Sequence, residues 1–119
     1  MVALFVALVA ARGRALHSEA GAWREAVRNA PELGRAWVNL GAVYSSYGRT
    51  DVARACYERA VGLDQCNATA LGNLGNLAQR DGARAEAEAY YRRALDCGQG
   101  DSDEREKWRE QLMKLTGGD

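Results

Sequence analysis

The sequence predicts an all-α fold in which antiparallel helix pairs stack at a fixed interval. Apolar residues three or four positions apart, such as Trp37, Leu40 and Tyr44, would share one face of a helix. The chain also resembles itself at a spacing of 34 residues, and its single proline, Pro31, leaves long helices uninterrupted. Its 119 residues correspond to one small domain.

The repeat is the strongest of these signals. Residues 34–67 align with residues 68–101 without a gap, and eleven positions are identical. The identical pairs are Ala36/Ala70, Asn39/Asn73, Leu40/Leu74, Gly41/Gly75, Gly48/Gly82, Ala53/Ala87, Ala55/Ala89, Tyr57/Tyr91, Arg59/Arg93, Ala60/Ala94 and Gln65/Gln99. Such self-similarity indicates two copies of one helix pair.

Each copy predicts two helices, over 34–47 and 51–63 and then over 68–80 and 84–97. Glycine at Gly48 and Asp81-Gly82 would make the turns, with Thr50 or Asp51 capping one helix and Asn67 another. A glycine inside a helix costs about 1 kcal/mol relative to alanine. We therefore expect a neighbouring helix to cross at Gly41 and at Gly75, where a Cβ atom has no room.

These residues resemble the tetratricopeptide repeat signature W-x2-L-G-x2-Y…A-x3-F. The first copy matches it at Trp37, Leu40, Gly41, Tyr44, Ala53 and Tyr57, with tyrosine in place of phenylalanine, and the second keeps Leu74, Gly75, Ala87, Tyr91 and Ala94. The departures are Leu71, Ala78 and the glutamines Gln65 and Gln99 in place of the closing proline. The resemblance implies a right-handed superhelix of helix pairs whose first helices line a concave groove.

The flanks extend the pattern. Residues 1–33 are expected to form a degenerate helix pair, in which Trp23 takes the aromatic position of the second helix, Ala26 the small one and Pro31 the closing proline. Residues 102–119 would form a capping helix and tail, with Trp108, Leu112 and Leu115 on one face and charged residues on the other.

Residues 1–11 are apolar on every side, and several interpretations stay open. They could form a repeat helix covered by a partner or by a second copy of the chain, or a signal segment, although no basic stretch precedes them. The following residues also resemble the junction between the last membrane helix and the repeats of multi-pass, glycosyltransferase-like tetratricopeptide proteins. That resemblance implies a soluble tail of a longer membrane protein, with Arg12 and Arg14 at the membrane edge.

The groove would be lined by first-helix residues not used in packing. We expect these to be Arg35, Val38, Asn39, Ala42, Ser46, Thr69, Gly72, Asn73, Asn76 and Arg80. Asn39 and Asn73 resemble the asparagine ladder of the O-linked N-acetylglucosamine transferase superhelix, which implies that they hold a peptide backbone; alternatively, each amide bonds within its own repeat. The carboxylate clamp of chaperone-binding relatives is disfavoured, because Asp103 would put a negative charge at an anion-binding position.

The composition disfavours several classes of function. Sixteen basic and sixteen acidic residues cancel, so nucleic acid is not an expected partner. Cys56, Cys66 and Cys97 lack metal-binding spacing and predict buried thiols, and no cofactor or catalytic motif is present. The sequence predicts a non-catalytic module that binds a protein or an extended peptide. The alternatives are self-association through the apolar N-terminal helix and the membrane-attached tail, so a cytoplasmic and a membrane-attached location both stay open.

Overall fold

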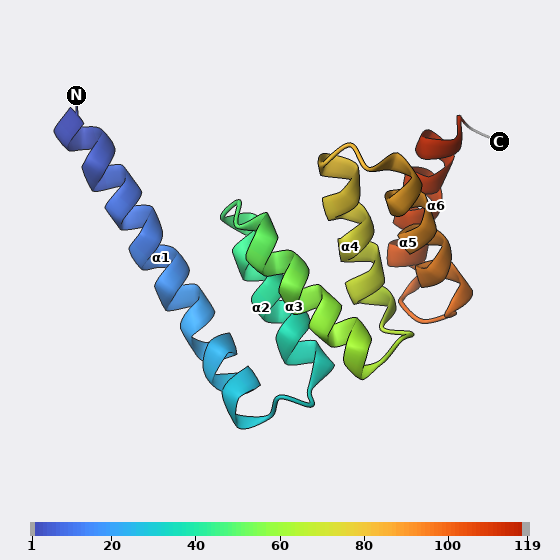
Figure 1. The fold of residues 1–119 in the computed structure, drawn as a ribbon, viewed down its shortest axis with the longest axis horizontal. Helices are drawn as coiled ribbons and strands as arrows, with labels where there is room; N and C mark the ends of the chain where they lie inside the picture. Colours follow the sequence, from blue (N-terminus) through green and yellow to red (C-terminus); the bar gives the residue numbers. More distant parts are fainter. Residues whose placement is uncertain (1, 118–119) are drawn as a thin grey trace.

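The computed structural model describes residues 2–117 and contains six α-helices. The predicted segments 1–33 and 102–119 extend beyond it by residue 1 and by residues 118–119. The helices are α1 (Val2–Asn29), α2 (Gly34–Ser46), α3 (Thr50–Leu63), α4 (Ala68–Arg80), α5 (Arg84–Asp96) and α6 (Ser102–Thr116). They follow one another along an open curve from α1 to α6 (Figure 1). The all-α fold is therefore confirmed.

The two repeats form helix hairpins, α2 with α3 and α4 with α5. Gly48 and Gly82 make the turns with φ of 77° and 76°, a backbone conformation that favours glycine. The amide oxygen of Asn67 accepts the backbone N–H of Ala70, so this residue caps α4 as predicted. Thr50 and Asp51 do not cap α3, because the helix already begins at Thr50 and Arg49 takes the capping position without a side-chain bond.

The helical glycines receive tyrosine rings from the paired helix. A Cβ atom on Gly41 would lie 2.7 Å from Cε1 of Tyr57, and one on Gly75 would lie 2.8 Å from Cε1 of Tyr91. Both tyrosine side chains are buried. The close approach that the sequence predicts is thus made by an aromatic side chain rather than by the neighbouring backbone.

A second contact joins each repeat to the next helix pair. Val38 of α2 is only 8% exposed and packs in a cluster with Ala70 and Leu74 of α4. One repeat later, Gly72 faces α6, and a Cβ atom there would lie 2.2 Å from Nε1 of Trp108. The expectation that Gly72 faces the groove is therefore wrong, because this position packs between repeats. Val38 likewise serves mainly the core.

The capping helix closes the stack. Trp108 is buried, and Leu112 and Leu115 pack beside it against the α4–α5 pair. The helix begins with a reciprocal capping box, in which the Asp101 carboxylate accepts the backbone N–H of Glu104 at 2.8 Å while the Glu104 side chain accepts that of Asp101.

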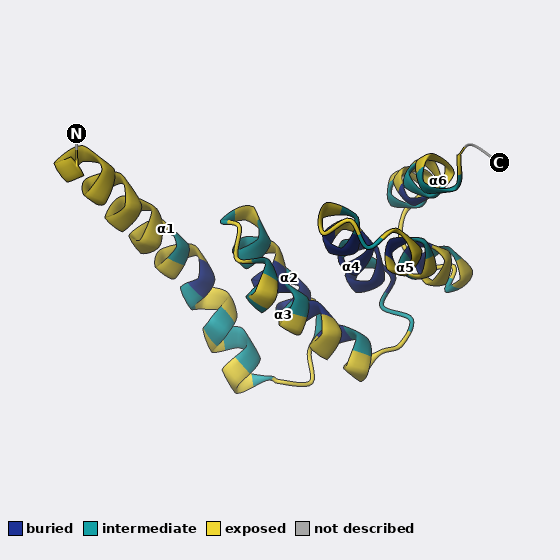
Figure 2. Cartoon of the chain, turned by 45° about the horizontal axis from the view of Figure 1, so that its top comes forward, coloured by how far each residue is buried: buried dark blue, intermediate teal, exposed yellow. Residues whose placement is uncertain are grey.

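The N-terminal segment differs from the predicted helix pair, because α1 is one continuous helix of 28 residues. Gly13 does not end it, since a single glycine among strong helix formers costs only about 1 kcal/mol. The second half of α1 packs on α2 through Ala20, while the first half projects away from the other helices and is exposed (Figures 1 and 2). Trp23 remains 36% exposed, because no other helix of residues 2–117 covers this side of α1.

The cysteines correct a further expectation. Cys66 and Cys97 form a disulfide with Cα atoms 5.3 Å apart, so only Cys56 is a buried thiol. Cys66 precedes α4 and Cys97 follows α5, and an antiparallel hairpin brings its two ends together. The disulfide therefore closes the second repeat at its base. Burial raises the pKa of the Cys56 thiol.

Candidate functional site

The candidate site is a groove along α2, α4 and α6, whose surface is hollowed in three places of about 280, 280 and 360 Å³. The first hollow is lined by Arg35, Val38, Asn39, Asn67 and Thr69. The second is lined by Ala42, Ser45, Ser46, Tyr57, Asn73, Asn76, Leu77 and Arg80, and the third by Asn76, Gln79, Arg80 and Gln111. Because Asn76 and Arg80 belong to both of the last two, these hollows are continuous.

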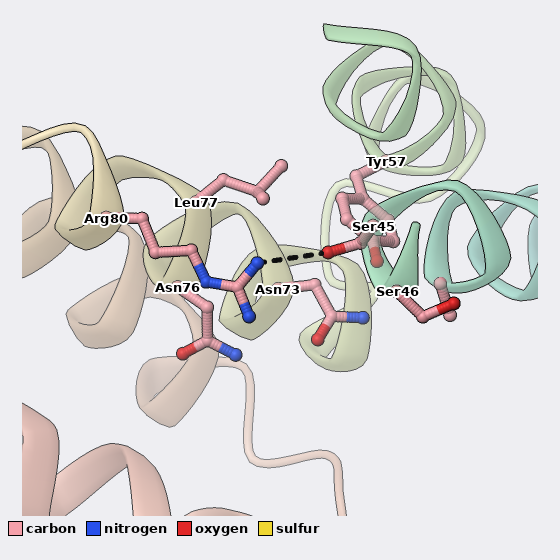
Figure 3. Close-up of a pocket in the computed structure, with 8 residues that line it drawn as sticks. Ser45, Ser46, Tyr57, Asn73, Asn76, Leu77 and Arg80 are labelled. Carbon is pink, nitrogen blue, oxygen red and sulfur yellow. Dashed lines mark hydrogen bonds between the residues drawn. The ribbon is translucent and has the colours of Figure 1, made fainter. Parts of the chain in front are cut away.

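Residues of both repeats face each other across the second hollow (Figure 3). Asn73, Asn76 and Arg80 project from α4, and Ser45 lies opposite on α2. A guanidinium N–H of Arg80 donates to the Ser45 hydroxyl over 3.4 Å, a long hydrogen bond that spans the groove. The groove therefore runs between consecutive repeats rather than within one.

The Asn39 and Asn73 amides occupy the same position in consecutive repeats. Both are partly exposed at the groove, and within residues 2–117 neither side chain takes part in a hydrogen bond. Asn67 and Asn76, in contrast, use their amide oxygens within the protein. The Asn39 and Asn73 amides can each offer one acceptor and two donor hydrogens to a ligand.

Tyr91 organises the end of the groove nearest α6. Its hydroxyl oxygen lies 2.5 Å from the amide oxygen of Asn76 and 3.0 Å from that of Gln79, and its single hydrogen is donated to one of them at a time. Burial raises the pKa of Tyr91 to about 12, so the hydroxyl keeps its proton at neutral pH. The pKa of Tyr57, which lines the second hollow, is raised to about 12 for the same reason.

The charges of the groove have one sign. Arg35 and Arg80 are its only charged lining residues, and neither forms an ion pair with another residue of the described range. Asp81, the neighbour of Arg80, pairs instead with Arg54. The groove thus combines amides and hydroxyls with two arginines.

Most of the predicted residues come together. Arg35, Asn39, Asn73, Asn76 and Arg80 all line the groove, whereas Val38 contributes little exposed surface. Sequence reasoning missed Ser45, Gln79 and Gln111. The 34-residue interval relates Ser45 to Gln79, so either residue could have indicated the other, whereas it relates Gln111 to the buried Leu77 and gives no groove signal there.

Metal-binding clusters and membrane-spanning helices are both absent from residues 2–117. There, no three histidine, cysteine or carboxylate side chains lie close enough to hold a metal ion. Within the same residues, no helix combines the length and the apolar character needed to cross a bilayer.

Comparison with known proteins identifies the family. Two family models described as tetratricopeptide repeat match residues 34–65 and 67–99, which together make up 65 of 119 residues. The chain belongs to the tetratricopeptide repeat family, whose members are generally non-catalytic protein-interaction scaffolds. The search of curated proteins gave no match.

Among solved structures, the chain is similar to YrrB, described as "a TPR protein with an unusual peptide-binding site". The TM-score is 0.67 with 22% sequence identity, over 84% of this chain and 60% of YrrB. At this identity the likeness concerns the fold alone. The chain corresponds to about 60% of the length of that protein.

Proposed function

We propose that the chain is a non-catalytic module that binds an extended peptide, or an extended segment of a partner protein, along the groove of α2, α4 and α6. The observation that carries this proposal is the pair of amides at Asn39 and Asn73, which face the groove without a hydrogen-bond partner within the described residues. A peptide backbone presents an N–H and a C=O in every residue, which is what a side-chain amide complements.

The alternative, in which each asparagine orients its own repeat, requires hydrogen bonds within the protein. Neither amide makes one in residues 2–117, so retention of asparagine at both positions favours a role toward a ligand. Asparagine also has low helix propensity, which makes two of them in the middle of helices a cost to folding. With two such amides we expect micromolar or weaker affinity.

The test is the double variant Asn39→Ala, Asn73→Ala. A peptide selected from a displayed random library by binding to the wild-type protein is titrated into both proteins by calorimetry. Each lost backbone contact costs about 1 kcal/mol, so we expect affinity to fall at least tenfold while thermal unfolding changes little.

Asn29→Ala provides the control, because Asn29 is exposed at the end of α1, away from the groove. It should leave the affinity unchanged. Full binding by the double variant would remove the asparagines from the site.

We propose self-association through α1 as a second candidate function. Six large apolar side chains in its first half are 56–78% exposed: Val2, Leu4, Phe5, Val6, Leu8 and Val9. In the complete repeats a first helix covers the second one, but the described chain supplies no such helix to α1. The α1 helix of a second copy has the matching apolar surface, and pairing would bury both.

This candidate predicts a dimer in sedimentation velocity at tens of micromolar, and a monomer after Phe5→Glu with Leu8→Glu. Met113→Glu is the matched control, since Met113 is a similarly exposed apolar residue on α6. A monomeric wild-type protein would contradict self-association. So would a monomer that co-sediments with neutral lipid vesicles, because α1 would then bind lipid rather than a second copy.

That the chain is the tail of a longer membrane protein remains a hypothesis based on the sequence. It is motivated by the apolar first half of α1 and the arginines that follow it, Arg12 and Arg14. The reading frame upstream of Met1 tests it directly: encoded membrane spans would support the hypothesis, and a stop codon immediately before Met1 would end it.

A further inference from the structure

One side of α1, here called its apolar face, carries apolar residues along the whole helix. These residues are spaced by three, four or seven positions, which places them in line on a helix. They are Leu4, Leu8, Ala11, Ala15, Ala22 and Ala26. Of the described helices, α2 alone packs extensively on α1, and it does so on another side, through Leu16, Ala20 and Val27. The apolar face is therefore exposed from Leu4 to Ala22 (Figure 2).

The side chains of the apolar face are large at one end of α1 and small at the other. Leu4 and Ala26 each lie eleven residues from Ala15, and Leu8 and Ala22 each lie seven residues from it. Two such helices that run in opposite directions, with Ala15 against Ala15, place each leucine on an alanine of the other copy. Facing positions that combine a large and a small side chain can interdigitate. The apolar face is thus complementary to itself in one register.

The aromatic residues that border the apolar face fit the same register. Phe5 and Trp23 are eighteen residues apart, or five helical turns, so both lie on one side of the face. In the antiparallel pair, the exposed Phe5 of one copy comes within about 3 Å of the level of Trp23 in the other, measured along the helix axis. Each exposed ring therefore gains an aromatic neighbour.

The charges on that side also match. Arg12 of one copy lies within one residue of the level of Glu19 in the other. Both are held there by Tyr47 of their own chain: the Arg12 guanidinium lies 5.6 Å from the centre of the ring, and Glu19 accepts the hydroxyl at 2.6 Å. Neither forms an ion pair within residues 2–117. Opposite charges at one level favour the antiparallel direction.

Other ways of covering α1 lack this complementarity. In a parallel pair each residue meets its own copy, so Ala22 lies on Ala22 and two Arg12 side chains become neighbours. Parallel pairing also brings the helices α2–α6 of both copies to the same end, since they lie beside the second half of α1 (Figure 1). A lipid surface covers the leucines of the first half but gives no role to the alanines of the second.

We propose that two copies of the chain associate through an antiparallel pair of α1 helices centred on Ala15, in which Leu4 and Leu8 of each copy pack on Ala26 and Ala22 of the other. The inference rests on self-association, the second candidate function, and adds the surface, direction and register of the contact. Two-fold symmetry makes each contact twice and closes the assembly at a dimer. None of the pairing residues lines the groove of α2, α4 and α6, so one dimer presents two grooves.

The first experiment measures the direction of the pair. Nitroxide labels are attached to Ala3→Cys and, separately, to Arg14→Cys, and the distance between the two labels of a dimer is measured by pulsed electron resonance. Both residues are exposed and lie off the apolar face. Because Ala3 is twelve residues from Ala15, we expect about 36 Å along the axis at position 3 and a much shorter distance at position 14. The wild-type protein is the labelling control, since Cys56 is buried and Cys66 is bonded to Cys97.

The second experiment tests the register by exchanging a large and a small residue. Leu8→Ala should raise the dissociation constant of the dimer at least about tenfold, because a leucine contact is lost twice. Ala22→Leu should also weaken the dimer, since it places leucine on leucine. The two changes together restore leucine on alanine, so the dissociation constant should return to within about threefold of the wild-type value. Val6→Ala is the matched control, because Val6 is 58% exposed, like Leu8 at 62%, but lies on the opposite side of α1.

The outcomes separate this inference from self-association itself. A wild-type dimer with short distances at both labelled positions, or a double variant no tighter than either single variant, would overturn the antiparallel pair and leave self-association standing. A wild-type protein that stays monomeric at tens of micromolar would contradict self-association and the antiparallel pair together.

Discussion

At the scale of single residues, each repeat depends on a helical glycine whose missing side chain leaves room for a tyrosine ring. Gly41 lies against the ring of Tyr57, and Gly75 against the ring of Tyr91. Both copies thus have glycine at a helical position where alanine would favour the helix more. Their cost in helix propensity is offset by the burial of an aromatic ring, which contributes about 1.5–3 kcal/mol.

Gly41→Ala should therefore destabilise the protein. The new Cβ atom would lie 2.7 Å from the Tyr57 ring, and overpacking of this kind costs about 1–3 kcal/mol, partly offset by better helix propensity. Gly62→Ala is the control, because Gly62 is helical and its Cβ atom would meet nothing within 4 Å. Urea unfolding should show a lower free energy for the first variant and an unchanged or higher one for the second.

The buried tyrosines predict a loss of stability in alkali. The pKa of Tyr57 and of Tyr91 is raised to about 12, so the folded state holds these protons above pH 10 while the unfolded chain releases them. The contribution of these tyrosines to the free energy of unfolding should be fully present below pH 10. It should fall between pH 10 and 12, by up to about 1.4 kcal/mol per tyrosine and pH unit. Unfolding of Tyr57→Phe with Tyr91→Phe should depend less on pH over this range; an identical slope would argue against the account.

At the scale of elements, the sequence predicted helix bounds closely where two kinds of signal agreed. Around α4, for example, Asn67 marks the beginning, Asp81-Gly82 the end and the apolar period the interior. Over residues 1–33 the helix pair was expected from the repeat interval alone, and no turn with positive φ divides α1 there. The disulfide was missed because spacing was compared with metal-binding motifs rather than with the two ends of a helix hairpin.

That disulfide should stabilise the second repeat. It joins residues 31 positions apart, and closing a segment of this length in the unfolded chain contributes about 3–4 kcal/mol. Reduction with dithiothreitol should lower the unfolding free energy of the wild-type protein by about that amount. The variant Cys66→Ala with Cys97→Ala should already have the lower value and should not respond to reduction. A wild-type protein insensitive to reductant would contradict the assigned bond.

At the scale of the whole molecule, stacking places α2, α4 and α6 along one groove, whose arginines and amides come from different repeats. Sequence could place Asn39 and Asn73 there because the repeat interval fixes their equivalence. It could not reveal that the Tyr91 hydroxyl reaches Asn76 and Gln79, since that contact depends on how α5 packs against α4. Val38 lines the first hollow and also packs between the repeats, and helical spacing alone does not show that one residue does both.

The most direct test of the groove is to locate a bound peptide on the protein. A selected peptide with a nitroxide label at one end is added to the isotope-labelled protein, and paramagnetic broadening of backbone signals is measured by NMR. The account predicts broadening along α2, α4 and α6, with the signals of Asn39, Asn73 and Gln111 among those affected. Broadening confined to the first half of α1, or to the exposed faces of α3 and α5, would contradict it.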